Sequence, residues 1–325
     1  SPRHSAIVRG PGFNLPWKTP SSALMSGPPR LFDRTLHRKR LDRAAAGYAS
    51  ADFLHRRAAE DIAERLEAIM RDFILAVDLS ARGGAFREAL AASDAAKRVD
   101  VLIEADLSPA MLAGRVGPRV VLDEEQLPFA PASLDLVVST LGLHWTNDVV
   151  GALIQVRQAL KPDGLFIGAF LGGQTLTELR QSLVAAESEI LGGAGSRVSP
   201  FADMQDAASL LQRAGFALPV ADLDRVNVTY AHPLKLMADL RQMGETGALA
   251  DRHPRALTRA LLARTAEIYV ERFGDADGRI PATYEIITLT GWSPHESQQQ
   301  PLRPGSAKMR LADALGVTEH SLPRE

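Results

Sequence analysis

The chain has 325 residues, a formal net charge of −2 and no cysteine. The length suits one large or two small domains, and the nearly balanced charge gives no global electrostatic basis for a nucleic-acid partner or a membrane surface. Without cysteine there is no disulfide, thiolate metal site or cysteine nucleophile. No apolar run reaches the length of a membrane span, so we expect no integral membrane segment, which leaves peripheral association open.

The first 31 residues are basic and rich in proline, with no acidic residue before Asp33. This composition is similar to that of an organellar transit peptide, and Met25 is an alternative natural start. Proline and glycine disfavour a stable helix in this segment. We therefore expect residues 1–31 to form a disordered extension.

Residues 32–72 are predicted to form a helical lid. The segment 32–43 is strongly basic and includes Arg34 and Arg38. These side chains either form a solvated helix face with internal ion pairs, or they contact the ligand or an acidic partner. Residues 51–70 place apolar side chains at helical spacing and lead directly into the first predicted strand.

The pattern of the chain centres on residues 73–84. A run of apolar, partly β-branched residues ends in Asp78, and Gly83 and Gly84 then precede a helical pattern. This is typical of a buried parallel strand that turns tightly into a helix. In open α/β sheets the ligand binds outside the carboxyl ends of the strands, where a turn with little side-chain bulk lets a nucleotide approach the backbone.

Ser80 and Arg82 depart from that pattern. They stand where a nucleotide-binding turn usually carries glycine, so the turn is a weak motif by itself. An ordinary strand-to-helix turn is an equally good interpretation of these residues alone.

Two further predicted strands end in acidic residues. Residues 99–105 lead to Asp106, whose carboxylate is placed to accept hydrogen bonds from ribose hydroxyls. Residues 119–122 lead to Asp123 and Glu124. An acid there either takes the exocyclic amine of an adenine or lies in a solvated loop.

The rest of the pattern alternates between strands and helices. Ser108 is expected to cap a helix with Pro109 at its first position. The alternation from 73 to 171 predicts a parallel, doubly wound α/β sheet. Further strands are expected over 134–139, 165–170, 225–230 and 282–290, and helices over 149–160, 176–190, 204–214, 233–243 and 255–273.

No standard catalytic motif is present. The chain has no H-E-x-x-H, P-loop or G-x-S-x-G sequence, so we assign no catalytic residue and expect no metal site. His144 and Trp145 follow the strand over 134–139, and we expect them to contact substrate or cofactor. The alternative for Trp145 is a core aromatic.

Several segments carry a resemblance to known proteins. D-L-S-A-R-G-G at 78–84, A-D-L-S at 105–108, D-E-E-x-L-P-F at 123–129 and L-D-L-V-V-S at 134–139 resemble class I S-adenosylmethionine-dependent methyltransferases. The likeness covers residues 73–171 and implies a Rossmann-like core.

Other segments narrow the resemblance to one family. They are F-D-R-x-L-H-R-x-R-x-D-R at 32–43, L-H-W-T-N-D at 143–148, G-G-x-T-L-x-E-L-R at 172–180 and G-W-x-x-H-E-S at 291–297. From about residue 31 to 308, the chain resembles the respiratory complex I assembly factor five type, known as an arginine hydroxylase of a complex I subunit. The malonyl-acyl carrier protein O-methyltransferases are a more distant relative.

The resemblance implies S-adenosylmethionine as cofactor, and it implies roles for individual residues. Arg82 would either point away from the cofactor or block its methionine end. The implied cofactor-binding residues are Asp78, Ser80, Gly83, Gly84, Asp106, Leu107, Asp123, Glu124 and Ser139, and the implied substrate contacts are His144, Trp145, Arg34 and Arg38.

The resemblance also implies how the chain is divided. An extension over 1–31 and a lid over 32–72 precede the cofactor-binding core over 73–171. The remaining core strands, with helical insertions that cover the substrate, occupy 172–292, and a tail follows over 293–325.

Three functions are compatible with these residues. The resemblance favours an enzyme that hydroxylates or methylates an arginine of a respiratory NADH dehydrogenase subunit during assembly. The second function is that of a malonyl-acyl carrier protein O-methyltransferase or a small-molecule O-methyltransferase. The basic run at 34–43 would suit an acidic carrier protein. Ser80 and Arg82 favour an assembly chaperone without catalysis. The location is expected to be cytoplasmic in a bacterial source and the mitochondrial matrix in a eukaryotic one.

Overall fold

The computed structural model describes residues 7–8, 30–251 and 257–299. The expected extension over 1–31 and tail over 293–325 lie mostly outside the described residues. The chain divides into one unit over Ser1–Pro294 and a second over His295–Glu325. All described helices and strands belong to the first unit.

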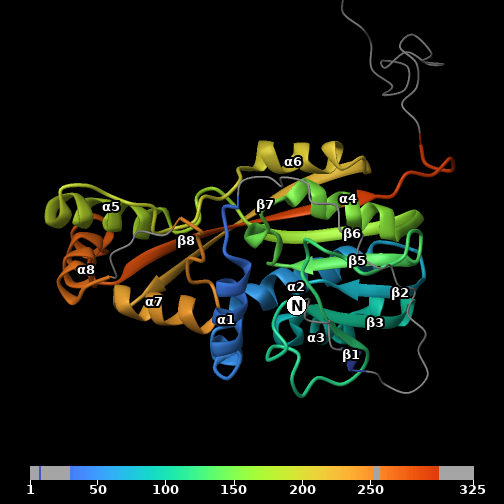
Figure 1. Cartoon of the computed structure of the whole chain (residues 1–325), viewed down its shortest axis with the longest axis horizontal. Helices are drawn as coiled ribbons and strands as arrows, with labels where there is room; N and C mark the ends of the chain where they lie inside the picture. Colours follow the sequence, from blue (N-terminus) through green and yellow to red (C-terminus); the bar gives the residue numbers. More distant parts are fainter. Residues whose placement is uncertain (1–6, 9–29, 252–256, 300–325) are drawn as a thin grey trace, which may run out of the picture. The chain divides into compact units, whose positions relative to one another are not determined.

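A mixed sheet forms the centre of the first unit, with strand order β1-β4-β3-β2-β5-β6-β8-β7 (Figure 1). The strands β4, β3, β2, β5 and β6 are parallel, and β8 runs antiparallel between β6 and β7. This topology confirms the expected doubly wound class I methyltransferase sheet. The bounds are β1 (Ile7–Val8), β2 (Phe73–Asp78), β3 (Val99–Asp106), β4 (Arg119–Val121), β5 (Leu134–Thr140), β6 (Leu160–Leu171), β7 (Ala217–Tyr230) and β8 (Ile280–Trp292).

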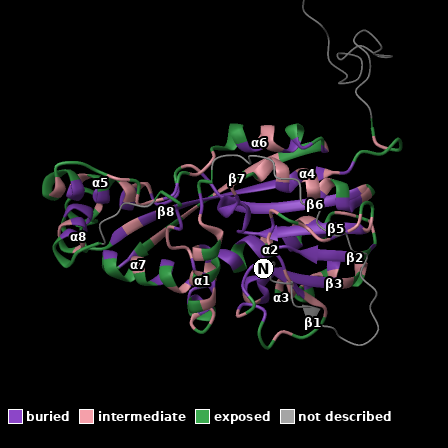
Figure 2. Cartoon of the chain, viewed as in Figure 1, coloured by how far each residue is buried: buried purple, intermediate pink, exposed green. Residues whose placement is uncertain are grey.

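The central strands are apolar because helices cover both faces of the sheet. Every residue of β5 is buried, and neighbours along it face opposite sides, with Leu136 in one core cluster and Val137 in the other. Parallel strands buried on both faces read as continuous apolar runs, which is the pattern that predicted them. Figure 2 shows these buried strands between helices whose outer faces are exposed.

The helices divide between the two faces of the sheet. Side chains of α2, α3, α5, α7 and α8 pack into one cluster and those of α4 and α6 into the other. In the described part of the chain, no helix has the length and apolar character needed to cross a bilayer. The bounds are α1 (Arg34–Ala44), α2 (Phe53–Glu67), α3 (Ala85–Ala92), α4 (Val149–Ala159), α5 (Thr177–Leu191), α6 (Met204–Arg213), α7 (Pro233–Gln242) and α8 (Arg259–Phe273).

The strands β7 and β8 continue beyond the rest of the sheet. β6 pairs with β8 only from Ile286 to Trp292, whereas β7 follows β8 as far as Ile280. The helices α5, α7 and α8 gather at this protruding end (Figure 1). The two-stranded extension is therefore a platform for the helical segments inserted after β6 and β7.

The prediction of a helix after Ser108 is wrong. Ser108 does accept a hydrogen bond from the N–H of Met111 at 3.2 Å, as a cap would. Residues 109–114 nevertheless form successive turns, with bonds of the i to i+3 type. Gly114 and Gly117 adopt φ of 73° and 105°. These left-handed glycines reverse the chain toward β4 before a helix can propagate.

We expect Leu136→Ala to lower the free energy of unfolding by about 2–5 kcal/mol, because it leaves a cavity in the centre of the sheet. Ile74→Ala is the matched control, because Leu136 is 0% exposed and Ile74 is 61% exposed. The control should lose less than about 1 kcal/mol. Chemical denaturation measures both, and equal losses would contradict the assigned core.

Candidate functional site

The acidic residues predicted from the sequence gather at one edge of the sheet. Asp78 ends β2, Asp106 ends β3 and Asp123 lies just beyond β4. Because these strands are parallel neighbours, their carboxyl ends meet. β2 lies where the strand order reverses, which is the position at which open α/β sheets bind ligands.

The turn after β2 is tightly wound. Arg82, Gly83 and Gly84 have φ of 35°, 74° and 85°, all in the left-handed region. Glycine adopts this region at little cost, whereas a side chain there is uncommon. A Cβ on Gly83 would lie 2.9 Å from the Tyr48 ring, so the glycine signal read from the sequence has a physical cause.

Ser80 is accommodated beneath this turn. Its hydroxyl lies 3.3 Å from Oε1 of Glu124 and 3.5 Å from the hydroxyl of Ser139. The backbone N–H of Ser80 donates to Oδ1 of Asp78 at 3.4 Å. Four predicted cofactor residues therefore meet here, and a serine at this position is compatible with the turn.

Asp106 occupies the expected place for a ribose-binding acid. Its Oδ1 accepts from the N–H of Ser108 at 2.7 Å, and its Oδ2 accepts from the N–H of Arg82 at 3.1 Å. Each carboxylate oxygen keeps a second lone pair for a hydroxyl donor. Burial raises the pKa of Asp106 to about 6, against the opposing charge of Arg82. Leu107 is buried beside it and packs with Tyr48.

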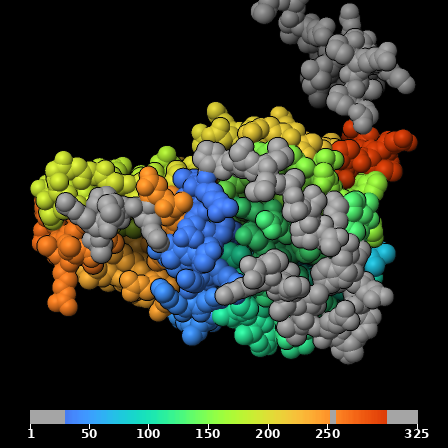
Figure 3. Space-filling view, in the orientation of Figure 1, coloured from blue at the N-terminus to red at the C-terminus, as the bar shows by residue number. Residues whose placement is uncertain are grey.

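Arg34 joins helix α1 to the acids after β4. Its guanidinium donates to Asp123 at 2.7 and 3.3 Å, contacts Glu124, and donates to the carbonyl of Trp145 at 3.0 Å. Although burial opposes it, the charges of Glu124 and Asp123 raise the pKa of Arg34. Figure 3 shows the blue surface of α1 between green and orange surfaces from later parts of the chain.

Arg38 is not part of this group. Its side chain is 50% exposed and lies 3.9 Å from Asp42 on the same helix. The structure therefore brings one of the two predicted lid arginines into the site and leaves the other on the outer face of α1.

Arg82 points into the protein. Its side chain is 2% exposed, and its Nη1 lies 3.0 Å from Oε1 of Glu245. Oε2 of Glu245 lies 2.9 Å from Nε2 of His144 and accepts from Nε1 of Trp145 at 2.9 Å. Burial would raise the pKa of Glu245, but His144 and Arg82 hold it well below its ordinary value.

Two buried histidines complete this cluster. His37 stacks on Trp145 with ring centroids 4.5 Å apart, and its Nε2 lies 3.4 Å from Nη2 of Arg82. Burial, helped by the charge of Arg82, lowers the pKa of His37 well below its ordinary value and that of His55 to about 3. Both imidazoles are therefore neutral near pH 7.

Sequence reasoning missed Glu245, His37 and His55. Glu245 follows α7 and lies in no motif, so only the fold brings it to Arg82. His37 belongs to the quoted L-H-R segment, which gave it a place in a pattern but no role. Among residues 30–251 and 257–299, no group of three or more His, Cys, Asp or Glu is placed to hold a metal ion.

Unpartnered polar atoms at this edge fit a polar ligand. Such buried atoms each cost about 1–3 kcal/mol unless a ligand or other group supplies a partner. They are Oδ2 of Asp78, Oγ1 of Thr140, Nδ1 of His144, Nδ1 of His37 and the hydroxyl of Tyr48. With Asp106, they suit the ribose and neighbouring polar groups of an adenosine cofactor, while the Arg82 guanidinium fills the region inward of the turn.

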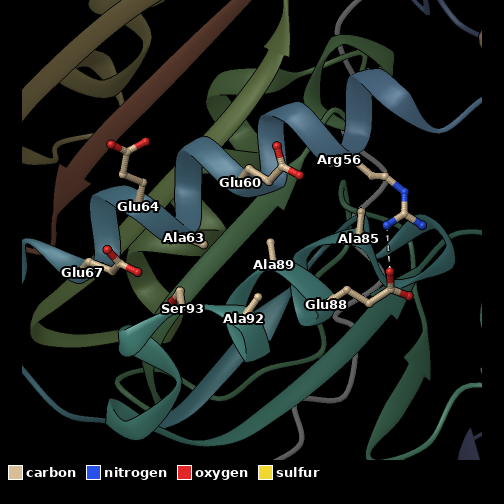
Figure 4. A pocket seen from close by; sticks show the side chains of 10 residues that line it. All are labelled: Arg56, Glu60, Ala63, Glu64, Glu67, Ala85, Glu88, Ala89, Ala92 and Ser93. Atoms are coloured by element: carbon tan, nitrogen blue, oxygen red, sulfur yellow. Dashed lines mark hydrogen bonds and ion pairs between the residues drawn. The ribbon is translucent and has the colours of Figure 1, made fainter.

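A groove of about 470 Å³ lies elsewhere, between α2 and α3 (Figure 4). Glutamates of α2 and small side chains of α3 line it, and Arg56 bridges the two helices to Glu88 at 3.0 Å. None of the predicted site residues belongs to its lining. The groove is therefore separate from the acids at the carboxyl edge.

We expect Arg34→Ala to lower the free energy of unfolding by about 3 kcal/mol, because it leaves two acids without their buried partner. Amide hydrogen exchange in α1 should accelerate at the same time. Arg38→Ala is the control, and its exposed pair should change stability by no more than about 0.5 kcal/mol. Unchanged exchange in α1 of the Arg34 variant would show that this contact does not hold α1 in place.

Residues 77–168 match the family described as "Methyltransferase domain". The arginine-hydroxylase NDUFAF5, mitochondrial, of Danio rerio is 40% identical over 290 residues, covering 87% of this chain and 89% of that protein. A malonyl-[acyl-carrier protein] O-methyltransferase of Laribacter hongkongensis is 34% identical over 292 residues, covering 84% of this chain and 94% of that protein.

Among solved structures, the Haemonchus contortus phosphoethanolamine N-methyltransferase 2 in complex with S-adenosyl-L-methionine has a TM-score of 0.46 and 17% identity, covering 80% of this chain and 60% of that chain. The family assignment depends on the relatives that match over most of both sequences. The chain belongs to the family of the NDUFAF5 arginine hydroxylases, within the S-adenosylmethionine-dependent methyltransferase superfamily.

Proposed function

We propose that S-adenosylmethionine binds at the carboxyl edge of β2, β3, β4 and β5. The ribose hydroxyls would donate to Asp106, and the adenine would lie near Asp123 and Glu124. The second lone pairs of Asp106 and the unpartnered polar atoms around it support this position. The bound cofactor supplies a sulfonium-activated methyl group. The protein excludes water with α1 and orients the ligand through the buried acids.

We further propose that the protein modifies an arginine side chain of a respiratory NADH dehydrogenase subunit during assembly. One observation carries this proposal: the 40% identity to an arginine hydroxylase extends over 87% of the chain, far beyond the methyltransferase domain at 77–168. An alignment of that length includes most of residues 32–72 and the helices α5, α7 and α8. A shared cover over the site supports a shared substrate.

Methylation and hydroxylation of arginine leave different products. Methylation moves a methyl group from the sulfonium to a guanidinium nitrogen, which loses a proton. Hydroxylation replaces a C–H bond by C–OH and is a two-electron oxidation, so it also needs dioxygen and an electron donor. The methylated product is heavier than arginine by a methylene group, and the hydroxylated product is heavier by an oxygen atom.

A second candidate function is methylation of malonyl-acyl carrier protein. Its support is the relative that matches over 94% of its own length and the outer face of α1. Arg38, Lys39 and Arg43 are exposed there, and an acidic carrier protein would complement them. In a eukaryotic source either function would place the protein in the mitochondrion, and in a bacterial source in the cytoplasm.

We expect deletion of the gene to remove an arginine modification from NADH dehydrogenase. Peptide mass spectrometry of the enzyme from deleted and complemented cells would show it, and the added mass identifies an oxygen or a methylene. An unmodified arginine in every sample, together with methyl ester formation on malonyl-acyl carrier protein by the purified protein, would instead establish the second function.

We expect Asp106→Asn to weaken S-adenosylmethionine binding by about 1.5–3 kcal/mol at neutral pH, since it removes charge-assisted hydrogen bonds to the ribose. Because the pKa of Asp106 is about 6, affinity of the wild type should fall as the pH drops through that value. The asparagine variant should lose this dependence. Calorimetric titration measures both effects.

The raised pKa of Asp106 also determines how the stability of the fold depends on pH. Folded Asp106 binds its proton more tightly than the unfolded chain does, so its contribution is present at low pH and is lost as the pH rises through about 6. Stability and cofactor affinity should therefore change in opposite directions over this window.

An unchanged affinity in Asp106→Asn would mean that the ribose binds elsewhere. No binding of the cofactor to the wild type would favour the assembly-chaperone function.

A further inference from the structure

Arg82 is a buried cation in the middle of the cofactor turn. Its backbone N–H donates to Asp106, so the residue is part of the turn that shapes the ribose position. Its guanidinium stays inside the protein, with the whole residue 1% exposed. A buried cation needs an anionic partner, because desolvation otherwise costs several kcal/mol. Glu245 is the nearer of its two anionic partners, at 3.0 Å, and Asp106 lies 3.9 Å away.

The contact between Arg82 and Glu245 is a single one. Nη1 lies 3.0 Å from Oε1 of Glu245, whereas Nε lies 3.9 Å from Asp106 and Nη2 lies 3.4 Å from the His37 ring. A guanidinium binds a carboxylate most strongly with two parallel N–H donors. The guanidinium of Arg82 therefore has donors that a better placed carboxylate would satisfy.

Glu245 would keep its other two partners if its contact with Arg82 opened. Its second oxygen is held by His144 and Trp145, both at 2.9 Å. The carboxylate would keep the N–H donor of Trp145 and its contact with the His144 ring after Arg82 turned to another anion. The penalty that normally follows the breaking of a buried ion pair would thus be reduced.

Glu245 belongs to the part of the chain that covers the site. The next residues pair with the start of the lid, through a bridge between Phe32 and Leu249 and a 2.6 Å bond from Arg40 to the carbonyl of Thr246. A carboxylate is therefore delivered to the cofactor turn by the same layer that closes over it. This arrangement places a carboxylate of the protein where a carboxylate-bearing ligand would meet Arg82.

We propose that Arg82 binds the carboxylate of the methionine moiety of S-adenosylmethionine, and that Glu245 holds this position in the free protein. Cofactor binding then exchanges one carboxylate for another at the same guanidinium. This inference rests on the proposed function, because it takes S-adenosylmethionine as the ligand. It also explains how an arginine can stand where such turns usually carry glycine, since the side chain contributes a ligand contact.

The test compares S-adenosylmethionine with decarboxylated S-adenosylmethionine, which keeps the adenosine, the sulfonium and the amine. By calorimetry, the wild type should bind the intact cofactor about 10- to 100-fold more tightly, the range of one charge-assisted contact. Arg82→Ala should lower the affinity for the intact cofactor to that for the decarboxylated one. Glu245→Gln should increase the preference for the intact cofactor, because the competing charge is gone.

Arg115→Ala is the matched control. Arg115 touches the far end of the same turn through the carbonyl of Gly84 at 3.4 Å and is paired with Glu104 at 3.0 Å. Its removal should leave the ratio of the two affinities unchanged. If Arg82→Ala fails to fold, two other variants provide the same comparison. Arg82→Gly removes the backbone strain at this position, and the double variant Arg82→Ala with Glu245→Gln leaves no unpaired buried acid.

The outcomes separate this inference from the proposed function. Equal affinity of the wild type for both ligands would overturn the role of Arg82 and leave S-adenosylmethionine binding intact. A loss of affinity for both ligands by the same factor in Arg82→Ala would also overturn it, since a purely structural residue would act that way. Absence of binding of either ligand to the wild type would overturn the proposed function and this inference together.

Discussion

The parallel pairing of β4, β3, β2, β5 and β6 is the constraint on which the site depends. Parallel strands require a crossover after each strand, so every strand ends at the same edge of the sheet. Acids that are separated by many residues, such as Asp78, Asp106 and Asp123, are thereby brought together. Without that ladder each would lie in an unrelated loop, and their chemistry would not combine.

Gathering acids at one buried edge creates an electrostatic cost that other parts of the chain offset. Arg34 comes from α1 and neutralises the pair after β4, while Arg82 comes from the turn itself and meets Glu245. His37 and His55 remain uncharged and add no further charge to balance. Helix α1 therefore has an electrostatic role, because one of the cations that balance the acids belongs to it.

The sequence was sufficient where local pattern decides structure. Apolar runs predicted the central strands, and Gly83 and Gly84 marked the tight turn because their φ values demand glycine. It was insufficient for the inward direction of Arg82, which depends on Glu245 at a separation of 163 residues. The helix expected after Ser108 failed for a local reason, since Gly114 and Gly117 outweighed a correct cap.

The bridge between Phe32 and Leu249 has a consequence for biosynthesis. The two residues lie far apart in the sequence, yet their backbones pair directly and the N–H of Asp33 donates to the carbonyl of Ala248 at 2.8 Å. The start of α1 leaves the ribosome early and can contact Asp123 and Trp145 once they have been made, but its contacts are complete only when residues 245–250 have followed. Because the chain emerges from the ribosome in sequence order, the contacts between the start of α1 and residues 245–250 form late, after the parallel strands β2 to β6 have been made.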